Sequence, residues 1–575
     1  MSNHKKLLFM LLLQALLLNR LTRNDLFSFP LQQGWPVIIN DDIGNEVLNL
    51  RDLDNDGTTE VLFSSNMPFW VPNSGKLYVY SYDGTPFLPV FPMDLGAGLC
   101  WCATGDLDLD GDFEVVLQVS ASRGPLIALH HDGTSVTGWP VESAFHPIIS
   151  DINGDSSPEV LAALGASDRM RAFSNYGEPV VDFVTGHHCE GMAAVGDING
   201  NGDTRIAVGT GPYGGSSDGV YQFYSDGSLV PGWPRAQGQR FNNPTTMADV
   251  NEDDIMEIIA QDQTGKHYLW KADGSEMYRE DDYYPLLGWC EVVPHDLDGD
   301  GDLELIFFVH YYWDSHDLID ARHHDGKSVS GWPQYVLGDP GGGAGFEAGV
   351  RIADIDGDHT AEILVATTDV GPTAYIYAWE TNGVLCDSFP IVVTDAYGVK
   401  PGAVDIAISD LDGDGDVEIV LTAWEMSISQ GIFKTIVYAW DLPGAWHPEA
   451  SPWPQWHQGP RRTGSLPIGG YPFVGEHTSL SQTEQVQLYA TIPNPFSNLT
   501  NITYALPKAT KISLKIYNIL GQEVRVLENT VQEPGYYEVT WNGKDQRERS
   551  VANGVYFLKM EADDFAATQK MLLLR

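Results

Sequence analysis

The stretch with the clearest capacity for chemistry is Asp410 to Glu418, which reads Asp-Leu-Asp-Gly-Asp-Gly-Asp-Val-Glu. Positions 1, 3, 5 and 9 are carboxylates, and position 6 is glycine. Carboxylates about 4–6 Å apart repel by on the order of 3–4 kcal/mol per pair at an effective dielectric constant near 20. A hard cation removes that repulsion, and Ca²⁺ takes about six to eight oxygens from alternate residues of a tight loop. An EF-hand would place its last acid at position 12 between helices. Here it stands at position 9 before an apolar run, so the pattern predicts a strand-loop-strand calcium site.

Versions of this loop recur along the first 464 residues, at intervals of about fifty residues. They begin at Asp52, Asp106, Asp151, Asp197, Asp249, Asp296, Asp354 and Asp410. The predicted calcium ligands are Asp52, Asp54, Asp56, Thr58, Glu60, Asp106, Asp108, Asp110, Asp112, Glu114, Asp151, Asn153, Asp155, Ser157, Glu159, Asp249, Asn251, Asp253, Glu257, Asp296, Asp298, Asp300, Asp302, Glu304, Asp354, Asp356, Asp358, Thr360, Glu362, Asp410, Asp412, Asp414, Asp416 and Glu418. The alternative is a set of Asp-Gly turns that hold no metal.

The copies differ in quality. The loops from Asp52, Asp106, Asp296 and Asp410 keep every acid and the glycine at position 6. The loop from Asp151 lacks that glycine, and Asp254 and His359 replace it in two others. The loop from Asp197 carries Arg205 where the closing acid should stand. We expect that loop to hold no ion, because the guanidinium neutralises the remaining charge.

The elements around each loop form a repeating unit. A strand precedes the loop and an apolar strand follows it, then an aromatic-rich strand, a turn of the Asp-Gly kind that suits a tight hairpin, and a Trp-Pro or Phe-Pro segment. Proline favours an edge strand because it cannot donate to a central ladder. Four short strands repeated at this period predict an all-β fold, a β-propeller with eight blades, or seven if one unit lies outside the ring. The additional Gly34-Trp35-Pro36 segment predicts that the first strand completes the last blade.

The overall composition excludes one class of partner. Lys plus Arg number 32 against 79 for Asp plus Glu, a net charge of −47, whereas nucleic-acid binding needs a basic surface. The hydrophobic fraction of 43% argues against a disordered acidic chain. No Cys-x-x-Cys pair is present, so the cysteines give no indication of zinc.

The two ends of the chain differ from the repeats. Residues 1–23 resemble a secretory signal peptide, with Lys5 and Lys6 before an apolar stretch too short to cross a bilayer. No later segment is long and apolar enough for a transmembrane helix in the mature chain. Residues 465–485 have the composition of a linker. Residues 486–575 alternate strands and turns, which predicts a small Ig-like β-sandwich.

Two family resemblances follow from these residues. Residues 29–464 resemble the FG-GAP/VCBS repeats of integrin-α-like β-propellers, through the acidic loops and the closing stretch from Trp453 to Gly464. That resemblance implies structural calcium and ligand recognition on one face. Residues 486–575 resemble the type A sorting domain of the type IX secretion system, through segments such as Asn494-Pro495-Phe496 and Gly554-Val555-Tyr556-Phe557. It implies export by that machinery across an outer membrane, followed by release or surface attachment.

A second group of residues could bind an organic ligand. His187, His188 and Glu190 precede the degenerate loop, and analogous positions in other units carry Trp101, Trp289, Glu291 and Glu347. If the first strand of each unit lines the axis, these side chains meet near the channel mouth and suit a sugar or peptide. The alternative is ordinary packing.

The sequence shows no constellation for catalysis, so the first hypothesis is a secreted or surface-held, non-catalytic binding or adhesion protein with a glycan or protein ligand. An extracellular carbohydrate-active enzyme similar to rhamnogalacturonan-lyase propellers is the second. A structural component of a surface layer or gliding machinery is the third.

Overall fold

The computed structural model describes residues 29–39, 48–65, 75–95, 99–119, 124–142, 144–164, 167–189, 191–211, 218–279, 291–309, 317–336, 349–368, 374–393, 402–427, 432–466 without 456, 458, 460 and 462, 487–488, and 500–573 without 507, 509, 520, 533, 534, 548, 563 and 564. The predicted signal peptide and most of the predicted linker lie outside these residues. The chain divides into two compact units, and the boundary falls between Ile468 and Gly469.

The described part of the first unit forms eight antiparallel sheets of three or four strands. In chain order they are β2 (Asn49–Arg51), β3 (Glu60–Ser64), β4 (Lys76–Tyr80), β5 (Met93–Asp94); β6 (Leu99–Gly105), β7 (Glu114–Val119), β8 (Leu126–Leu129); β9 (Ala144–Ser150), β10 (Glu159–Leu164), β11 (Arg169–Phe173), β12 (Pro179–Val184); β13 (Ala194–Asp197), β14 (Thr204–Gly209), β15 (Val220–Tyr224); β16 (Thr246–Ala248), β17 (Glu257–Gln261), β18 (His267–Trp270), β19 (Glu276–Arg279); β20 (Val293–His295), β21 (Glu304–Val309), β22 (Asp317–Arg322), β23 (Gln334–Val336); β24 (Arg351–Ala353), β25 (Glu362–Thr368), β26 (Ala374–Trp379), β27 (Ile391–Val393); and β28 (Gly402–Ser409), β29 (Asp416–Ser427), β30 (Ile432–Ala445), β1 (Val37–Ile39). The described strands of β6–β8 and β13–β15 make three-stranded sheets, one strand fewer than predicted.

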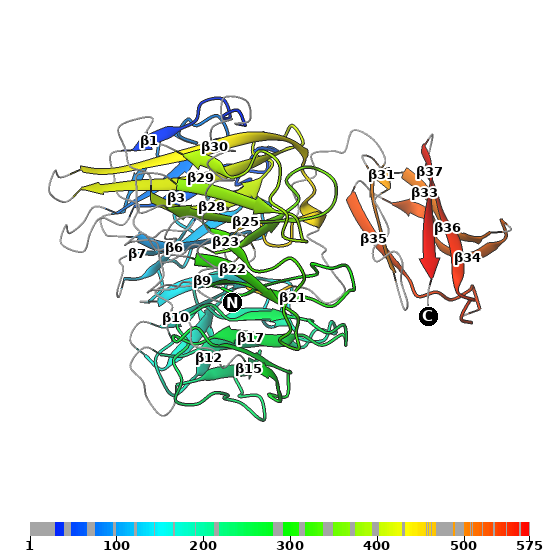
Figure 1. Ribbon diagram of the computed structural model, residues 1–575, viewed down its shortest axis with the longest axis horizontal. Helices are drawn as coiled ribbons and strands as arrows, with labels where there is room; N and C mark the ends of the chain where they lie inside the picture. The colour runs from blue at the N-terminus through cyan, green and yellow to red at the C-terminus, as the bar shows by residue number, and fades with distance from the viewer. Residues whose placement is uncertain are drawn as a thin grey trace, which may run out of the picture. The chain divides into compact units, whose positions relative to one another are not determined.

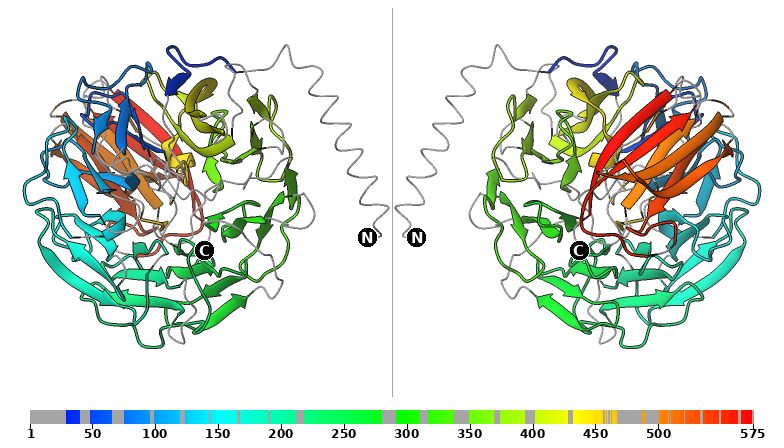
Figure 2. Two further views of the ribbon diagram at one scale, coloured as in Figure 1. Left: turned by 90° about the vertical axis from the view of Figure 1, so that its left-hand side faces the viewer. Right: turned by 90° about the vertical axis from the view of Figure 1, so that its right-hand side faces the viewer.

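The sheets of the first unit surround a common centre (Figure 2). The first strands of neighbouring sheets lie beside one another, such as β2 beside β6 and β28. The ring is closed by the N-terminal strand, as predicted, because Val37 of β1 pairs with Val437 of β30. The short first strands therefore form the inner wall. Apolar clusters between sheets fill the space around it, such as the one that joins Leu50 and Val61 to Ala407 and Val420.

The Gly-Trp-Pro segments connect neighbouring sheets. Each indole N–H donates a hydrogen bond to a carbonyl oxygen at the turn of the next sheet: Trp35 to Tyr82 (2.7 Å), Trp139 to Asn175 (3.0 Å), Trp233 to Ala272 (3.0 Å) and Trp332 to Thr381 (2.9 Å). The preceding glycine permits this approach, because a Cβ at Gly138 would lie 2.0 Å from the carbonyl oxygen of Tyr176. The repeated tripeptide is thus a contact between sheets as well as the start of an outer strand.

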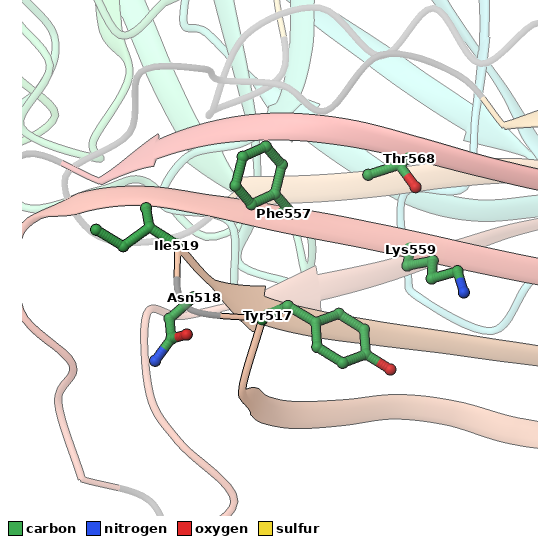
Figure 3. Close-up of a pocket in the computed structure, with 7 residues that line it drawn as sticks. Tyr517, Asn518, Ile519, Phe557, Lys559 and Thr568 are labelled. Atoms are coloured by element: carbon green, nitrogen blue, oxygen red, sulfur yellow. The ribbon is translucent and has the colours of Figure 1, made fainter.

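The second unit is a β-sandwich, as predicted (Figure 1). One sheet holds β31 (Gln487–Leu488), β32 (Thr500–Leu506) and β35 (Gly535–Trp541), and the other holds β34 (Glu523–Gln532), β33 (Thr510–Asn518), β36 (Gly554–Ala562) and β37 (Phe565–Leu573). Tyr504 and Trp541 from the first sheet share one buried cluster with Leu514 and Leu558 from the second. A hollow of about 390 Å³ lies on the second sheet, lined by residues that include Tyr517, Ile519, Phe557 and Lys559 (Figure 3).

Candidate functional site

The acidic loops share one backbone design, which the loop from Asp410 illustrates. The Asp410 carboxylate accepts hydrogen bonds from the N–H of Gly413 (2.8 Å) and of Gly415 (3.1 Å). Glu418, on the strand after the loop, accepts one from the N–H of Leu411 (2.6 Å). The first and last acids of the sequence pattern therefore both accept hydrogen bonds from the backbone of the loop and hold it in a closed turn.

The other predicted ligands converge in the same way. Ligand oxygens of Asp52, Asp54 and Glu60 lie within 4.8 Å of one another, as do those of Asp106, Asp108 and Asp110. Residues at position 7 donate their N–H to the carboxylate at position 5, as Asp416 does to Asp414 (2.9 Å). The structure thus gathers acids whose repulsion a cation would remove.

Two positions of the loop need a left-handed backbone, of which the sequence pattern indicated only position 6. The glycines there have positive φ, for example 101° at Gly111 and 92° at Gly415. Where glycine is replaced, φ stays positive, at 69° for Ser156, 61° for Asp254 and 70° for His359. The missing glycine therefore does not change the loop, although a left-handed residue with a side chain costs about 1–2 kcal/mol. Position 4 is also left-handed, at Asn55 and Leu109 among others.

Two closing glutamates show why a cation fits. Glu257 and Glu362 are each 1% exposed, and their Oε2 atoms accept hydrogen bonds from Val250 and Ile355. Among the described residues, no donor reaches the buried Oε1 atom of either one. Burial raises the pKa of Glu257 to about 8 and that of Glu362 to about 9. An oxygen that is buried without a partner beside other carboxylates is suited to a hard divalent cation, which takes oxygen ligands.

Two loops add an imidazole to their oxygen ligands. The Nδ1 atom of His130 lies 3.0 Å from Glu114 Oε1, and that of His323 lies 2.8 Å from Glu304 Oε1. Both histidines stand just after the third strand of their sheet, and nothing in the loop pattern indicated them. A third cluster joins His359 and His447 to Asp354.

Basic side chains enter two other loops. Arg205 pairs through Nε with Asp203 Oδ1 (2.8 Å) and lies over the ring of Tyr224. That geometry agrees with the expectation that a guanidinium compensates this loop. In the loop from Asp249, the ammonium group of Lys271 lies 3.1 Å from Asp253, an interaction that the sequence did not predict.

The loops are linked to one another around the ring. The N–H of the residue at position 8 donates to the carbonyl oxygen at position 2 of the preceding loop: Phe113 to Leu53, Met256 to Ile198, Leu303 to Val250 and, across the closure, Thr59 to Leu411. A change in one loop is therefore transmitted to the backbone of the next.

The described residues between Trp453 and Leu466, which we call the axial segment, contact the inner strands of several sheets. Its backbone and side chains hydrogen-bond to the inner strands or to the residues beside them: Trp453 to Ile352, Pro454 to Ile408, Gln455 to Leu50, Arg461 to Ile149, Thr463 to Val195, and Gly464 and Leu466 to Met247. From the sequence, this stretch contributed only to a family resemblance, and no structural role was predicted for it. It occupies the place where an axial ligand was expected.

Glu291, one of the predicted ligand-binding residues, makes its contacts within the protein. Its carboxylate is buried, accepts a hydrogen bond from the N–H of His457 in the axial segment (3.0 Å), and lies 3.3 Å from Arg351. The carboxylate oxygens are therefore occupied by the protein itself.

The other candidates for an organic ligand do not form one group in the described residues. Trp101 is half-buried and packs edge-on against His146, with ring centroids 5.0 Å apart. The Nδ1 atom of His187 lies 2.5 Å from the buried Asp218, and His188 is half-buried nearby in the chain. Glu190, Trp289 and Glu347 lie outside the described residues.

The comparisons with known proteins support the fold. The family model described as the FlgD Ig-like domain matches residues 495–564. The crystal structure of the V. cholerae biofilm matrix protein Bap1 is similar with a TM-score of 0.53 and 13% identity, and the match covers 78% of this chain and 97% of that one. The Dos1 propeller matches with a TM-score of 0.44 and 11% identity, covering 72% of this chain and 96% of that one. PorZ, from Porphyromonas gingivalis, matches with a TM-score of 0.34 and 13% identity, covering 95% of this chain and 61% of that one.

No curated protein matches the sequence. The first unit is a β-propeller and the second contains an Ig-like domain, which confirms the predicted fold classes. In the part of the chain that the structure describes, no helix has the length and apolar character needed to span a membrane.

Proposed function

We propose that this protein is a secreted or surface-held β-propeller with eight blades, stabilised by calcium, that acts as a non-catalytic binding or adhesion module. The observation that carries the calcium assignment is the convergence of carboxylates around buried oxygens, above all Glu257 Oε1 and Glu362 Oε1. We assign calcium to the five loops that keep a closing glutamate and have no histidine directly after the third strand, which begin at Asp52, Asp151, Asp249, Asp354 and Asp410. The proposed number of eight blades is supported by the eight sheets of the described residues and by the hydrogen bond from Thr59 to Leu411.

A binding role fits the way in which the charged groups are used. Many of the carboxylates lie in the acidic loops, and Glu291 and Asp405 pair with Arg351 beside the axial segment. Side chains engaged in this way are poor general acids or bases, because a catalytic carboxylate must reach a proton of the substrate. Bap1, whose fold is similar, is a biofilm matrix protein. We propose a comparable extracellular role here, with a glycan or protein ligand on a face or rim of the propeller.

The binding role predicts saturable attachment to at least one class of extracellular polymer. The full mature chain, labelled and kept in millimolar Ca²⁺, should bind glycans or matrix proteins on a broad array, and chelator should reduce binding because it loosens the loops. Pectic polysaccharides incubated with the same preparation should yield no unsaturated products. Absence of binding across the array would contradict the proposal, and unsaturated products would replace it with the lyase hypothesis.

We propose that the second unit targets the protein to the type IX secretion machinery. The support is the sequence resemblance of residues 486–575 to the type A sorting domain and an Ig-like fold of matching extent. A periplasmic reporter fused to residues 486–575 should reach the medium or the cell surface of a bacterium that has this system. The matched control is the same fusion in a strain that lacks the secretion pore. Equal export from both strains, or none from either, would contradict this assignment.

A further inference from the structure

Two of the acidic loops contain a ligand set that calcium does not favour. The tetrapeptide His-His-Asp-Gly occurs at residues 130–133 and again at 323–326, each time at the end of a third strand. In the first copy, His130 Nδ1 lies 3.0 Å from Glu114 Oε1 and 3.9 Å from Asp108 Oδ2. In the second, His323 Nδ1 lies 2.8 Å from Glu304 Oε1, and the ligand atoms of Asp298, Glu304 and His323 lie within 4.8 Å of one another.

The histidine occupies a position that can be compared between seven of the eight sheets. In seven of the sheets, the residue after the third strand or at its end donates its N–H to the carbonyl oxygen four residues later. These residues are Ser81, His130, Ser174, Tyr224, Lys271, His323 and Glu380. We call this residue the facing position. Its backbone hydrogen bond is the same in these seven sheets, whereas its side chain differs from one sheet to another. Lys271 uses it to reach Asp253, and Tyr224 uses it to contact Arg205.

The side chain at the facing position changes which cation the loop prefers. Calcium is a hard ion that takes oxygen ligands, whereas imidazole nitrogen suits Zn²⁺ and other borderline divalent ions. Zinc binds nitrogen and carboxylate oxygen at about 2.0–2.2 Å, so two tetrahedral ligands lie about 3.4 Å apart. The distances of 3.0 and 3.9 Å around His130 bracket that spacing. A zinc ion then needs only small movements of these side chains.

The second histidine of each pair supports this arrangement. The Nδ1 atom of His131 lies 3.2 Å from Asp112 Oδ2, and that of His324 lies 2.9 Å from Asp302 Oδ2. Each therefore engages the carboxylate at position 7 of the loop. Glu114 and Glu304 are fully buried and fixed through Oε2 by the N–H of Leu107 and Leu297, so one oxygen of each is presented to the imidazole.

We propose that Asp108, Glu114 and His130, and likewise Asp298, Glu304 and His323, form two binding sites for a borderline divalent cation of the zinc class. The sites do not depend on calcium in the five loops assigned to that ion. The lack of cysteine pairs in the sequence does not bear on them, because their ligands are imidazole and carboxylate. The competing arrangement is an imidazolium that neutralises the loop, with no metal bound.

The experiment measures zinc and calcium in the same samples of the full mature chain. The protein is equilibrated with micromolar Zn²⁺ in the presence of millimolar Ca²⁺, passed through a desalting column, and analysed for both metals by mass spectrometry. The parent chain should retain zinc at both sites. His130→Ser and His323→Ser should each retain one zinc ion fewer than the parent, and the double variant two fewer, with at least a tenfold loss of zinc affinity at each altered site. Serine is the native residue at the facing position of two other sheets, so the variants preserve the backbone there.

The matched control is His187→Ser, which removes an imidazole that faces no acidic loop and should leave both zinc ions. X-ray absorption at the zinc edge should show one nitrogen among oxygen ligands. Fewer than one zinc ion per parent chain, or equal zinc in the parent and the double variant, would overturn the inference. Calcium content separates the two proposals. A parent chain that retains calcium but no zinc contradicts only the zinc sites, and a parent chain that retains zinc but no calcium contradicts only the calcium assignment.

Discussion

Removal of calcium should lower the melting temperature of the propeller by roughly 8 °C at pH 7.5. Extracellular calcium sites have dissociation constants of about 10⁻⁴–10⁻³ M. At ten times that concentration each site contributes about 1.4 kcal/mol, so the five loops assigned to calcium contribute about 7 kcal/mol. A unit of roughly 430 residues unfolds with an entropy of about 0.9 kcal/mol per kelvin, which converts that free energy into the predicted shift. Calorimetry of the full chain in 10 mM Ca²⁺ and then in excess chelator measures it.

The second unit supplies an internal control for this measurement. Residues 469–575 contain no copy of the acidic loop, so any separate transition of the β-sandwich should stay in place. Magnesium should restore little of the lost stability, because it needs near-octahedral geometry and gives up its water reluctantly. An unchanged propeller transition in chelator would remove the calcium assignment.

The size of the chelator effect should depend on pH in a defined direction. Burial raises the pKa of Glu257 and Glu418 to about 8 and that of Glu362 to about 9, from an ordinary value near 4.5. Between about pH 4.5 and 8 the folded, metal-free protein therefore binds more protons than the unfolded chain. Its stability falls as pH rises through that window. The difference in melting temperature between calcium and chelator should widen from pH 5.5 to pH 8, and a constant difference would show that these carboxylates do not face the ion.

Local sequence was sufficient to predict the loops, because their chemistry is contained in nine consecutive residues. Alternating acids and a closing glutamate are enough to place four carboxylates on one turn, and the structure brings Asp52, Asp54 and Glu60 together as expected. The repeat period and the Trp-Pro segments likewise predicted the ring and its closure by β1. What the pattern misjudged was the need for glycine at position 6, since His359 and Ser156 adopt the same left-handed backbone.

The contacts between distant parts of the chain could not be predicted in this way. The facing position that brings His130 to Glu114 depends on how the third strand folds back over the loop, which no local pattern encodes. The axial segment has no periodicity, and its hydrogen bonds go to strands that lie throughout the sequence. Glu291 was for this reason assigned to a ligand site, although its partners are Arg351 and His457.

Replacement of Arg351 by alanine should destabilise the propeller by about 3–5 kcal/mol. The guanidinium is fully buried, lies 3.3 Å from Glu291, pairs with Asp405, and donates through Nε to the carbonyl oxygen of Ile406 (3.0 Å). Alanine would leave two carboxylates buried without their cation, and the loss of one partner from a buried ion pair typically costs this much. Arg351, in β24, contacts Asp405 and Ile406 in β28 and Glu291, which precedes β20. Without the guanidinium these three segments would lose a contact that they share beside the axial segment. Calorimetric or denaturant unfolding of the full chain measures the change.

Two variants separate the effect of the buried charge from that of lost side-chain volume. Arg279→Ala removes an arginine that is 43% exposed and lies 3.8 Å from Glu276, and it should change stability by less than about 1 kcal/mol. Arg351→Met combined with Asp405→Asn keeps most of the volume and removes one of the two carboxylates, so it should recover part of the loss from Arg351→Ala. Because Glu291 also anchors the N–H of His457, Arg351→Ala should in addition make the axial segment more sensitive to protease than the double variant does. A variant Arg351→Ala with stability within 1 kcal/mol of the parent would show that the charges at the centre of the ring are hydrated, and that the axial segment is held by its backbone hydrogen bonds alone.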